Sequence, residues 1–192
     1  MSDLPAEPTD PDLRLRAVGF LVTVAGALTA GIGAMLTWVS VSLPGTIPEV
    51  YPGVDLLEGT IALGLAVVAL VAVLASRIAA TGSARRGAAV AVVVAGIALG
   101  AIAGGEALTA GRRFRDDVVG DVTRAVGGSV SPVDATALEA AIDVRLGVGL
   151  WLTLAGGVAT AAGGLVTLAW ASRRVATGRD VAARPRPDGA DG

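Results

Sequence analysis

The sequence predicts an all-α membrane protein with four transmembrane helices, in which spans three and four are extended into an outer helical hairpin. Three observations lead to this fold class. First, 53% of the 192 residues are hydrophobic and 17% are charged, and the mean hydropathy is +0.70, values outside the usual range of soluble domains. Second, four apolar stretches each reach the roughly 20 residues that a helix needs to cross a bilayer. Third, helix-forming sequence follows the third stretch and precedes the fourth.

The four predicted spans cover about residues 17–39, 56–76, 87–105 and 146–171, and none has an ionisable residue near its middle. A soluble four-helix bundle is the alternative, but its helices would each carry a charged face, whereas these stretches are apolar all round. A cleaved signal peptide is the alternative for the first span. That span has 23 residues, more than the roughly 7 to 15 of a signal peptide's apolar region, so we expect it to remain as an anchor.

The chain divides into one transmembrane domain and two tails. Residues 14–174 form the predicted four-helix domain, with outer connections at 40–55 and 106–145. Residues 1–13 and 175–192 are rich in Pro, Asp and Gly. They contain too few apolar side chains to offset the entropy of ordering, so the sequence predicts two disordered tails.

The orientation follows from arginine, because the chain contains no lysine. The segments before span one, between spans two and three, and after span four together carry ten arginines, and the other two connections carry five, all between residues 106 and 145. The positive-inside rule therefore predicts a multi-pass protein of the plasma membrane with cytoplasmic N- and C-termini. Arg173, Arg174 and Arg179 are interpreted as topological anchors, since a dedicated lipid site needs a denser basic cluster.

The three tryptophans lie near span ends, where an indole ring with one polar edge prefers the headgroup level. Trp38 closes span one and Trp151 lies near the start of span four, both on the predicted outer side, while Trp170 lies at an inner end. We interpret all three as depth markers and not as binding residues.

Small residues predict how the helices associate, since apolar burial does not drive helix to helix inside lipid. Span three has Gly96, Gly100 and Gly104 on one face, and span four has Gly157 within a similar stripe. These stripes predict close packing of spans three and four within one chain, which we favour over a dimer interface.

The longer outer connection predicts a helical hairpin. Residues 106–126 have an apolar arc opposite charged residues, the pattern of an amphipathic helix. Ser131 is a candidate N-cap before Pro132, and we expect the helix from Pro132 to continue without a break into span four. A register centred near residue 129 brings Arg115 opposite Asp143 in a partly buried pair. The alternative geometry places both helices on the headgroups.

The shorter outer connection contains prolines at 44, 48 and 52 and short β-branched runs, which predict a compact cap over the helix ends. Glu49, Asp55 and Glu58 make this region acidic. Their spacing matches no standard cation-binding loop, so we interpret them as a solvated rim.

The composition removes most catalytic chemistry. The chain has no histidine and no cysteine, which excludes an imidazole base, a thiolate nucleophile and metal sites built on either residue. In the longer outer connection Ser129 follows two glycines, but the nucleophile-elbow pattern needs a glycine two residues later, where the chain has Ser131 followed by Pro132. We expect no enzyme activity, no cofactor and no metal. A net charge of -2 gives no attraction to nucleic acid.

Three features of the sequence carry a resemblance: Trp38, the entry into span two through Gly53, Val54 and Asp55, and the opening of span four from Gly147 to Trp151. In these features the chain resembles a family of small uncharacterised four-span membrane proteins of high-GC actinobacteria. The resemblance implies a four-span topology and no site. The chain is less closely similar to the membrane protein associated with tryptophan operons. Tetraspanins are excluded, because their loop cysteines are missing.

Two functions are compatible with these features. The first is a structural, assembly or interaction protein of the cell envelope, which contacts membrane lipid and presents its outer hairpin to a protein partner. The alternative is a transporter or oligomeric pore that works without an intramembrane charged relay, since the spans contain only Ser and Thr as polar groups at their centres.

Overall fold

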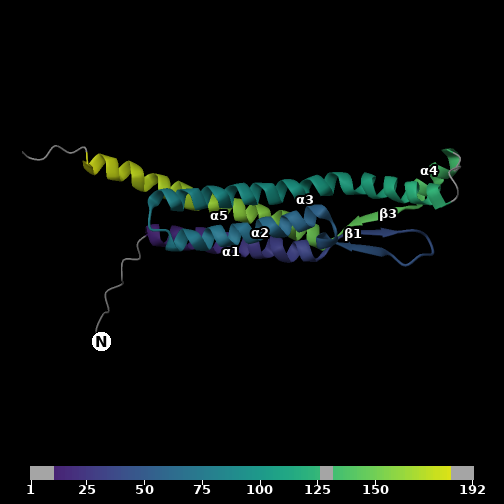
Figure 1. The fold of residues 1–192 in the computed structure, drawn as a ribbon, viewed down its shortest axis with the longest axis horizontal. Coiled ribbons are helices and arrows are strands. Elements are labelled where there is room, and N and C mark those ends of the chain that lie inside the picture. Colours follow the sequence, from purple (N-terminus) through teal and green to yellow (C-terminus); the bar gives the residue numbers. More distant parts are fainter. Residues whose placement is uncertain (1–10, 126–131, 183–192) are drawn as a thin grey trace, which may run out of the picture.

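The computed structural model describes residues 11–125 and 132–182 as four long helices, a short helix and a small sheet. The long helices form an antiparallel bundle (Figure 1) and are α1 (Pro11–Met35), α2 (Leu57–Ile78), α3 (Gly82–Ala125) and α5 (Val148–Ala182). Within the described ranges, four helices are long and apolar enough to cross a membrane. The prediction of four such helices is therefore confirmed.

Two of the helices extend into segments that the sequence predicts as disordered. Residues 11–13 belong to α1 and residues 175–182 belong to α5. Pro11 is tolerated at the start of α1 because the first turn of a helix has unpaired N–H groups. Beyond span four, the next proline is Pro185, so no residue of the extension blocks helix geometry. The rest of both predicted tails lies outside the described residues.

A three-stranded antiparallel sheet covers one end of the bundle, which we call the sheet end. Its order is β2 (Glu49–Pro52), β1 (Thr37–Ser42), β3 (Asp143–Leu146). The compact cap predicted for residues 40–55 is thus a β-hairpin followed by a short 3-10 helix, η1 (Gly53–Asp55). The hairpin turn follows Pro44, and Gly45 has φ of 82°, a conformation that favours glycine at this position of a turn.

The sheet overturns the prediction of one unbroken helix from Pro132 into span four. α4 (Pro132–Ala141) ends before β3, and α5 begins only at Val148. In β3, Val144 pairs with Val41 and Leu146 with Val39. The segment alternates charged and apolar residues, as a half-buried strand does. Pairing with β1 satisfies its backbone groups and overrides local helix propensity.

The most extensive contact in the bundle joins α1 and α5, which pack through glycines spaced seven residues apart. A β-carbon on Gly156 would lie 2.6 Å from the carbonyl oxygen of Gly26, and one on Gly33 would lie 2.7 Å from that of Gly149. Only residues without a side chain permit backbones to approach so closely. We call this contact the glycine seam; its opposed pairs are Gly19 with Gly163, Gly26 with Gly156, and Gly33 with Gly149.

Threonines follow the same seven-residue spacing four positions after the glycines of α5. Thr153, Thr160 and Thr167 donate to the carbonyl oxygens of Gly149, Gly156 and Gly163 at 2.8 to 3.0 Å. Thr23 of α1 donates in the same way to Gly19 at 2.9 Å. Each hydroxyl is therefore satisfied by its own helix, which lets these residues lie inside an apolar bundle.

In the long helices, many buried positions hold small side chains and many exposed positions hold large apolar ones, the reverse of the usual distribution in soluble proteins. The buried face of α2 consists of Gly59, Ala62, Ala66, Ala69 and Val73. Larger apolar side chains of α2 lie on its outer face; Val71 is 60% exposed and Leu74 is 56% exposed. Small residues inside and large apolar residues outside are typical of helices that pack in lipid, and a soluble protein rarely exposes so much continuous apolar surface.

Candidate functional site

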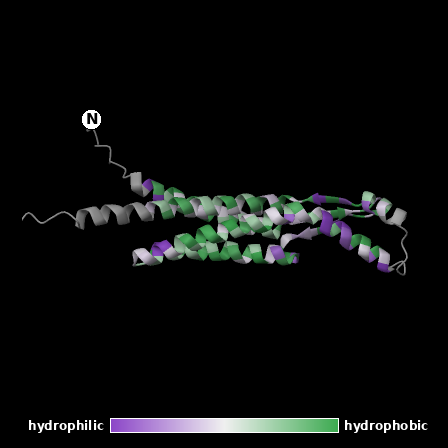
Figure 2. Ribbon diagram, turned by 90° about the horizontal axis from the view of Figure 1, so that it is seen from above, coloured by the Kyte–Doolittle hydropathy of each residue, from purple (hydrophilic) through white to green (hydrophobic). Residues whose placement is uncertain are grey.

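The sheet end carries a structured extension, which we call the head. It consists of β1, β2, β3, η1, α4 and the part of α3 from Glu106 to Ala125. The 22 residues of α2 span about 33 Å, whereas the 44 residues of α3 span about 66 Å. α3 therefore continues past the ends of α1 and α2 beside the sheet (Figure 1). This second half of α3 is also its hydrophilic half (Figure 2).

An apolar interface joins the sheet to the projecting part of α3. The ring of Tyr51 in β2 packs against Phe114 of α3, with centroids 5.2 Å apart. Ile142, just before β3, is 3% exposed, and Val118, Val119, Leu138 and Val144 pack on the same cluster. Because these contacts come from three segments distant in sequence, the head is a packed unit and not a set of separate loops.

The hydroxyl of Tyr51 is fixed by its own strand. It donates to Glu49 Oε2 at 2.7 Å. This hydrogen bond to the carboxylate, followed by partial burial, raises the pKa of Tyr51 above its ordinary value. The phenol is therefore protonated throughout the physiological range and serves as a hydrogen-bond donor.

An ionic cluster lies where the head meets the bundle. Arg113 Nη1 of α3 lies 2.8 Å from Glu58 Oε1 of α2 and 3.2 Å from Glu106 Oε1. Glu106 is 7% exposed, and the Oε2 atoms of both glutamates are buried without a hydrogen-bond partner among the described residues. One guanidinium thus compensates two carboxylates. Glu58 is therefore not part of a solvated rim.

Replacing Arg113 by Met is expected to destabilise the protein by about 1 to 2 kcal/mol, because it leaves Glu58 and Glu106 facing each other unpaired. The loss is smaller than for a fully buried pair, since the Arg113 side chain is 51% exposed. Denaturant unfolding in micelles measures it. Glu106→Gln on top of Arg113→Met should recover part of the loss. Arg112→Met, an exposed neighbour, should have little effect, and equal losses at both arginines would contradict the cluster's role.

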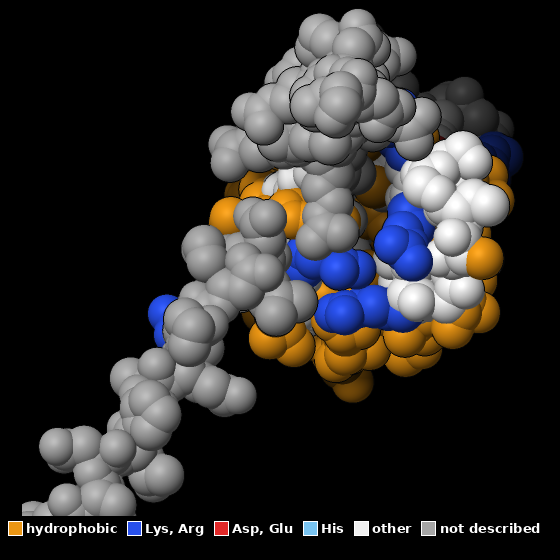
Figure 3. Space-filling view, turned by 90° about the vertical axis from the view of Figure 1, so that its left-hand side faces the viewer, with side chains coloured by type: hydrophobic (Ala, Val, Ile, Leu, Met, Phe, Trp, Pro, Cys, Tyr) orange, Lys and Arg blue, Asp and Glu red, His pale blue; other side chains and the backbone are white. Residues whose placement is uncertain are grey.

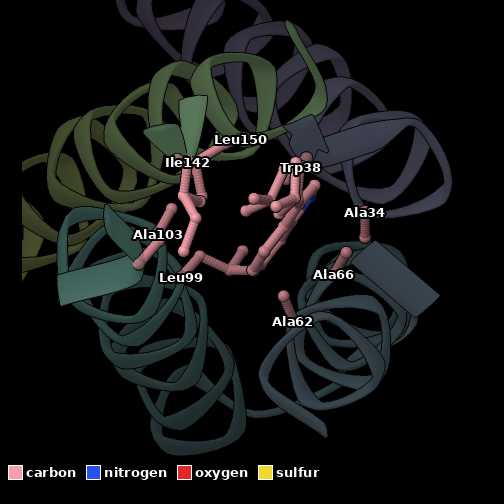
Figure 4. Packing of buried hydrophobic residues seen from close by; sticks show 12 residues of the cluster. Ala34, Trp38, Ala62, Ala66, Leu99, Ala103, Ile142 and Leu150 are labelled. Carbon is pink, nitrogen blue, oxygen red and sulfur yellow. The ribbon is translucent and has the colours of Figure 1, made fainter. Parts of the chain in front are cut away.

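Trp38 is a core residue, which corrects its interpretation as a depth marker. Its side chain is 0% exposed and points between the helices that carry Leu99, Leu150 and Ala66 (Figure 4). The indole Nε1 donates to the carbonyl oxygen of Gly33 at 3.0 Å. This oxygen, in the last turn of α1, also accepts from the backbone N–H of Leu36 at 3.1 Å. A register irregularity between Thr37 and Val39 lets both Trp38 and Val39 face inward, as a β-bulge does.

The other two tryptophans differ from Trp38. Trp151 of α5 is 51% exposed near the sheet end. Trp170 lies at the opposite end of the bundle, where the guanidinium of Arg16 stacks 4.3 Å from its ring centre. Both positions are near helix-bundle ends, as the sequence predicts.

The predicted pair between Arg115 and Asp143 is replaced by another. Asp143 pairs with Arg145, two residues further along β3, at 2.8 Å. The salt bridges of the described residues do not include Arg115, which is exposed. The prediction assumed two facing helices, and the formation of β3 removes that register. Ser131, the predicted N-cap, lies outside the described residues.

The glycines predicted for the contact between spans three and four take different positions. A β-carbon on Gly96 would lie 2.8 Å from Gly157 O, and one on Gly157 would lie 2.8 Å from Gly100 N, so these residues lie where α3 meets α5. A β-carbon on Gly104 would meet no atom within 4 Å. Gly104 itself is therefore not at a close approach of two helices. The sequence analysis missed the glycine seam, although its seven-residue spacing is visible in spans one and four.

The head exposes apolar side chains that its own fold does not use. Ile47, in the loop between β1 and β2, is 92% exposed, and Leu108 of α3 is 80% exposed. Leu57, at the start of α2, is 71% exposed. Among the described residues, no group of three or more acidic side chains is arranged to hold a metal ion.

No protein-family model matches the chain, and no curated protein matches it significantly.

Proposed function

We propose that the protein is an integral membrane protein in which α1, α2, the first half of α3 and α5 cross the lipid bilayer. The distribution of side-chain size supports this proposal. Exposed large apolar residues surround the bundle, while most of its buried positions away from the sheet end are occupied by Ala, Gly and Thr. In water this arrangement would expose the more hydrophobic side chains and bury the less hydrophobic ones, against the main driving force of folding.

The proposed orientation places the head outside the plasma membrane and both termini in the cytoplasm. The end of the bundle opposite the head carries Arg16, Arg77, Arg85 and Arg86, and we call it the arginine end. Basic residues are retained on the cytoplasmic side during insertion. A single cysteine at Ile47 should then react with an impermeant maleimide on intact cells, and one at Ser83 only after permeabilisation. The opposite pattern would contradict the orientation.

The role we propose is that of a structural or assembly protein of the cell envelope, which holds the head at a fixed height for a protein partner. The observation that carries it is the continuity of α3. About 30 Å of this helix, the 20 residues from Glu106 to Ala125, projects from the bundle and packs against a sheet. Such a rigid support is suited to presenting a surface, and exposed apolar residues such as Ile47 and Leu108 are suited to binding one.

The alternative role, a transporter or oligomeric pore, has less support. Trp38, Leu99 and Leu150 are fully buried at the sheet end, and the glycine seam brings two helix backbones into contact. At the sheet end, these large buried side chains occupy the space between the helices. A pore would need to form between several chains.

Site-specific photocrosslinking in living cells tests the proposed role. A crosslinker at Ile47 should yield a discrete adduct with one protein, and a crosslinker at Val71, on the outward face of α2, should yield none. The Arg113→Met variant, which loosens the junction between head and bundle, should weaken the adduct at Ile47. An ion or solute flux in reconstituted vesicles above that of empty vesicles, without an adduct at Ile47, would favour the pore instead.

A further inference from the structure

A cavity opens at the arginine end of the bundle, away from the head. Its volume is about 390 Å³, and all four long helices line it. α1 contributes Phe20, α2 contributes Arg77, α3 contributes Arg85 and Arg86, and α5 contributes Trp170. Because each wall comes from a different helix, the cavity is a product of the tertiary fold.

The cavity combines a basic rim with an apolar interior. Arginine side chains gather on this face of the molecule (Figure 3). Arg77 stacks over the ring of Phe20 at 4.0 Å, and Arg16 stacks over Trp170. These stacks restrain the guanidinium groups beside the opening. Deeper in, Val73 and Thr167 line the wall.

No described acidic residue neutralises this rim. The lining of the cavity contains no carboxylate. Among the described residues, none of Arg77, Arg85 and Arg86 is in a salt bridge. Arg85 uses its Nε to donate to the carbonyl oxygen of Ala79 at 3.0 Å, which caps the end of α2, and its terminal nitrogens are further donors. Three guanidinium groups therefore concentrate positive charge at one opening.

We propose that this cavity binds the head group of an anionic phospholipid. The phosphate lies at the arginine rim, where guanidinium groups form paired hydrogen bonds to its oxygens, and the glycerol and the start of the acyl chains lie against the apolar wall. A free phosphate or nucleotide would use the rim but not that wall. This assignment depends on the proposed insertion of the bundle in a bilayer. In that orientation the opening of the cavity lies at the cytoplasmic leaflet, which carries anionic lipid. It is independent of any partner of the head.

The test uses the purified full chain, stripped of lipid in a neutral detergent, and follows thermal unfolding during titration with short-chain lipids. Phosphatidylglycerol should raise the unfolding midpoint in a saturable manner, and phosphatidylcholine with the same chains should not. Inorganic phosphate and glycerol phosphate should give no comparable shift at concentrations where phosphatidylglycerol saturates. A shift of equal size with either free anion would show an anion site and overturn the lipid assignment.

Matched variants test whether phosphatidylglycerol binds at the arginines that line the cavity. Arg86→Gln and Arg77→Gln should each weaken phosphatidylglycerol about tenfold, the loss expected for one charge-assisted contact. Arg14→Gln makes the same charge change on α1, outside the cavity lining, and should change the affinity by less than about twofold. Equal losses in Arg14→Gln and Arg86→Gln would overturn the site in favour of general attraction to this end.

A second variant covers the case in which an arginine change impairs folding. Ser83 is exposed and lines the cavity, so Ser83→Glu adds a carboxylate at the opening with little effect on the core. Unfolding without lipid should be unchanged, and stabilisation by phosphatidylglycerol should be lost. Retention of full binding in Ser83→Glu would contradict the proposal. Photocrosslinking at Ile47 is unaffected by either outcome, so failure of this site and failure of the head's proposed role are distinguishable.

Discussion

Gly156→Ala is expected to lower the stability of the bundle by about 2 kcal/mol or more, the upper range for overpacking a well-packed core. The added methyl group would lie 2.6 Å from the carbonyl oxygen of Gly26, a backbone atom that cannot rotate away. α1 and α5 must therefore separate along the glycine seam, which loosens the most extensive contact in the protein. Unfolding with sodium dodecyl sulfate in mixed micelles measures the loss.

The matched control is Gly64→Ala in α2. A β-carbon there meets no atom within 4 Å, so the substitution adds helix propensity without a clash, worth up to about 1 kcal/mol in an ordinary helix. The two Gly→Ala changes should thus have opposite signs, or differ clearly in size. Similar effects at Gly156 and Gly64 would show that α1 and α5 do not pack through this seam.

Trp38→Ala is expected to cost about 3 to 5 kcal/mol, the range for removing a large aromatic side chain from a core. The indole fills the space beneath the sheet beside Leu99 and Leu150 and covers Gly53 of η1. Its removal leaves a cavity at the junction of bundle and head, and the carbonyl oxygen of Gly33 loses one of its two hydrogen bonds, keeping the one from Leu36 N–H. The same micellar unfolding assay, with hydrogen exchange of β1, reports both consequences.

Two further tryptophan variants separate packing from position. Trp38→Phe keeps part of the volume but loses the hydrogen bond to Gly33, so its cost should be intermediate. Trp151→Ala removes an indole that is 51% exposed and should cost less than about 1 kcal/mol. If Trp151→Ala were as damaging as Trp38→Ala, Trp38 would not be the core residue that its burial indicates.

The structure of the head could be predicted only in part from the sequence. The helical signal after Pro132 is real, and α4 begins there. A continuous helix was nevertheless the wrong inference, because the four residues of β3 pair with a strand about a hundred positions earlier in the chain. The error carried over to Arg115 and Asp143, whose predicted contact depended on the helical register.

The candidate site was predictable only in part. Glu106 and Arg113 are seven residues apart on one helix, a spacing that places both on the same face. The third member of the cluster, Glu58, could not be predicted in this way, because it joins the other two only when α2 packs beside α3. The cavity at the arginine end has the same origin, since Arg77 and Arg86 lie on different helices and face one opening only after the bundle forms.

The amino-acid sequence determined the four long apolar helices and the absence of histidine and cysteine chemistry, because hydropathy and composition are properties of each segment by itself. The tertiary structure decided which helix meets which. It paired the glycines of α1 with those of α5, closed the sheet with β3, and moved Trp38 from an expected interfacial position into the core. These outcomes depend on which residues lie opposite one another across the fold, and small residues, which allow several partners, leave that choice open until the whole bundle is packed.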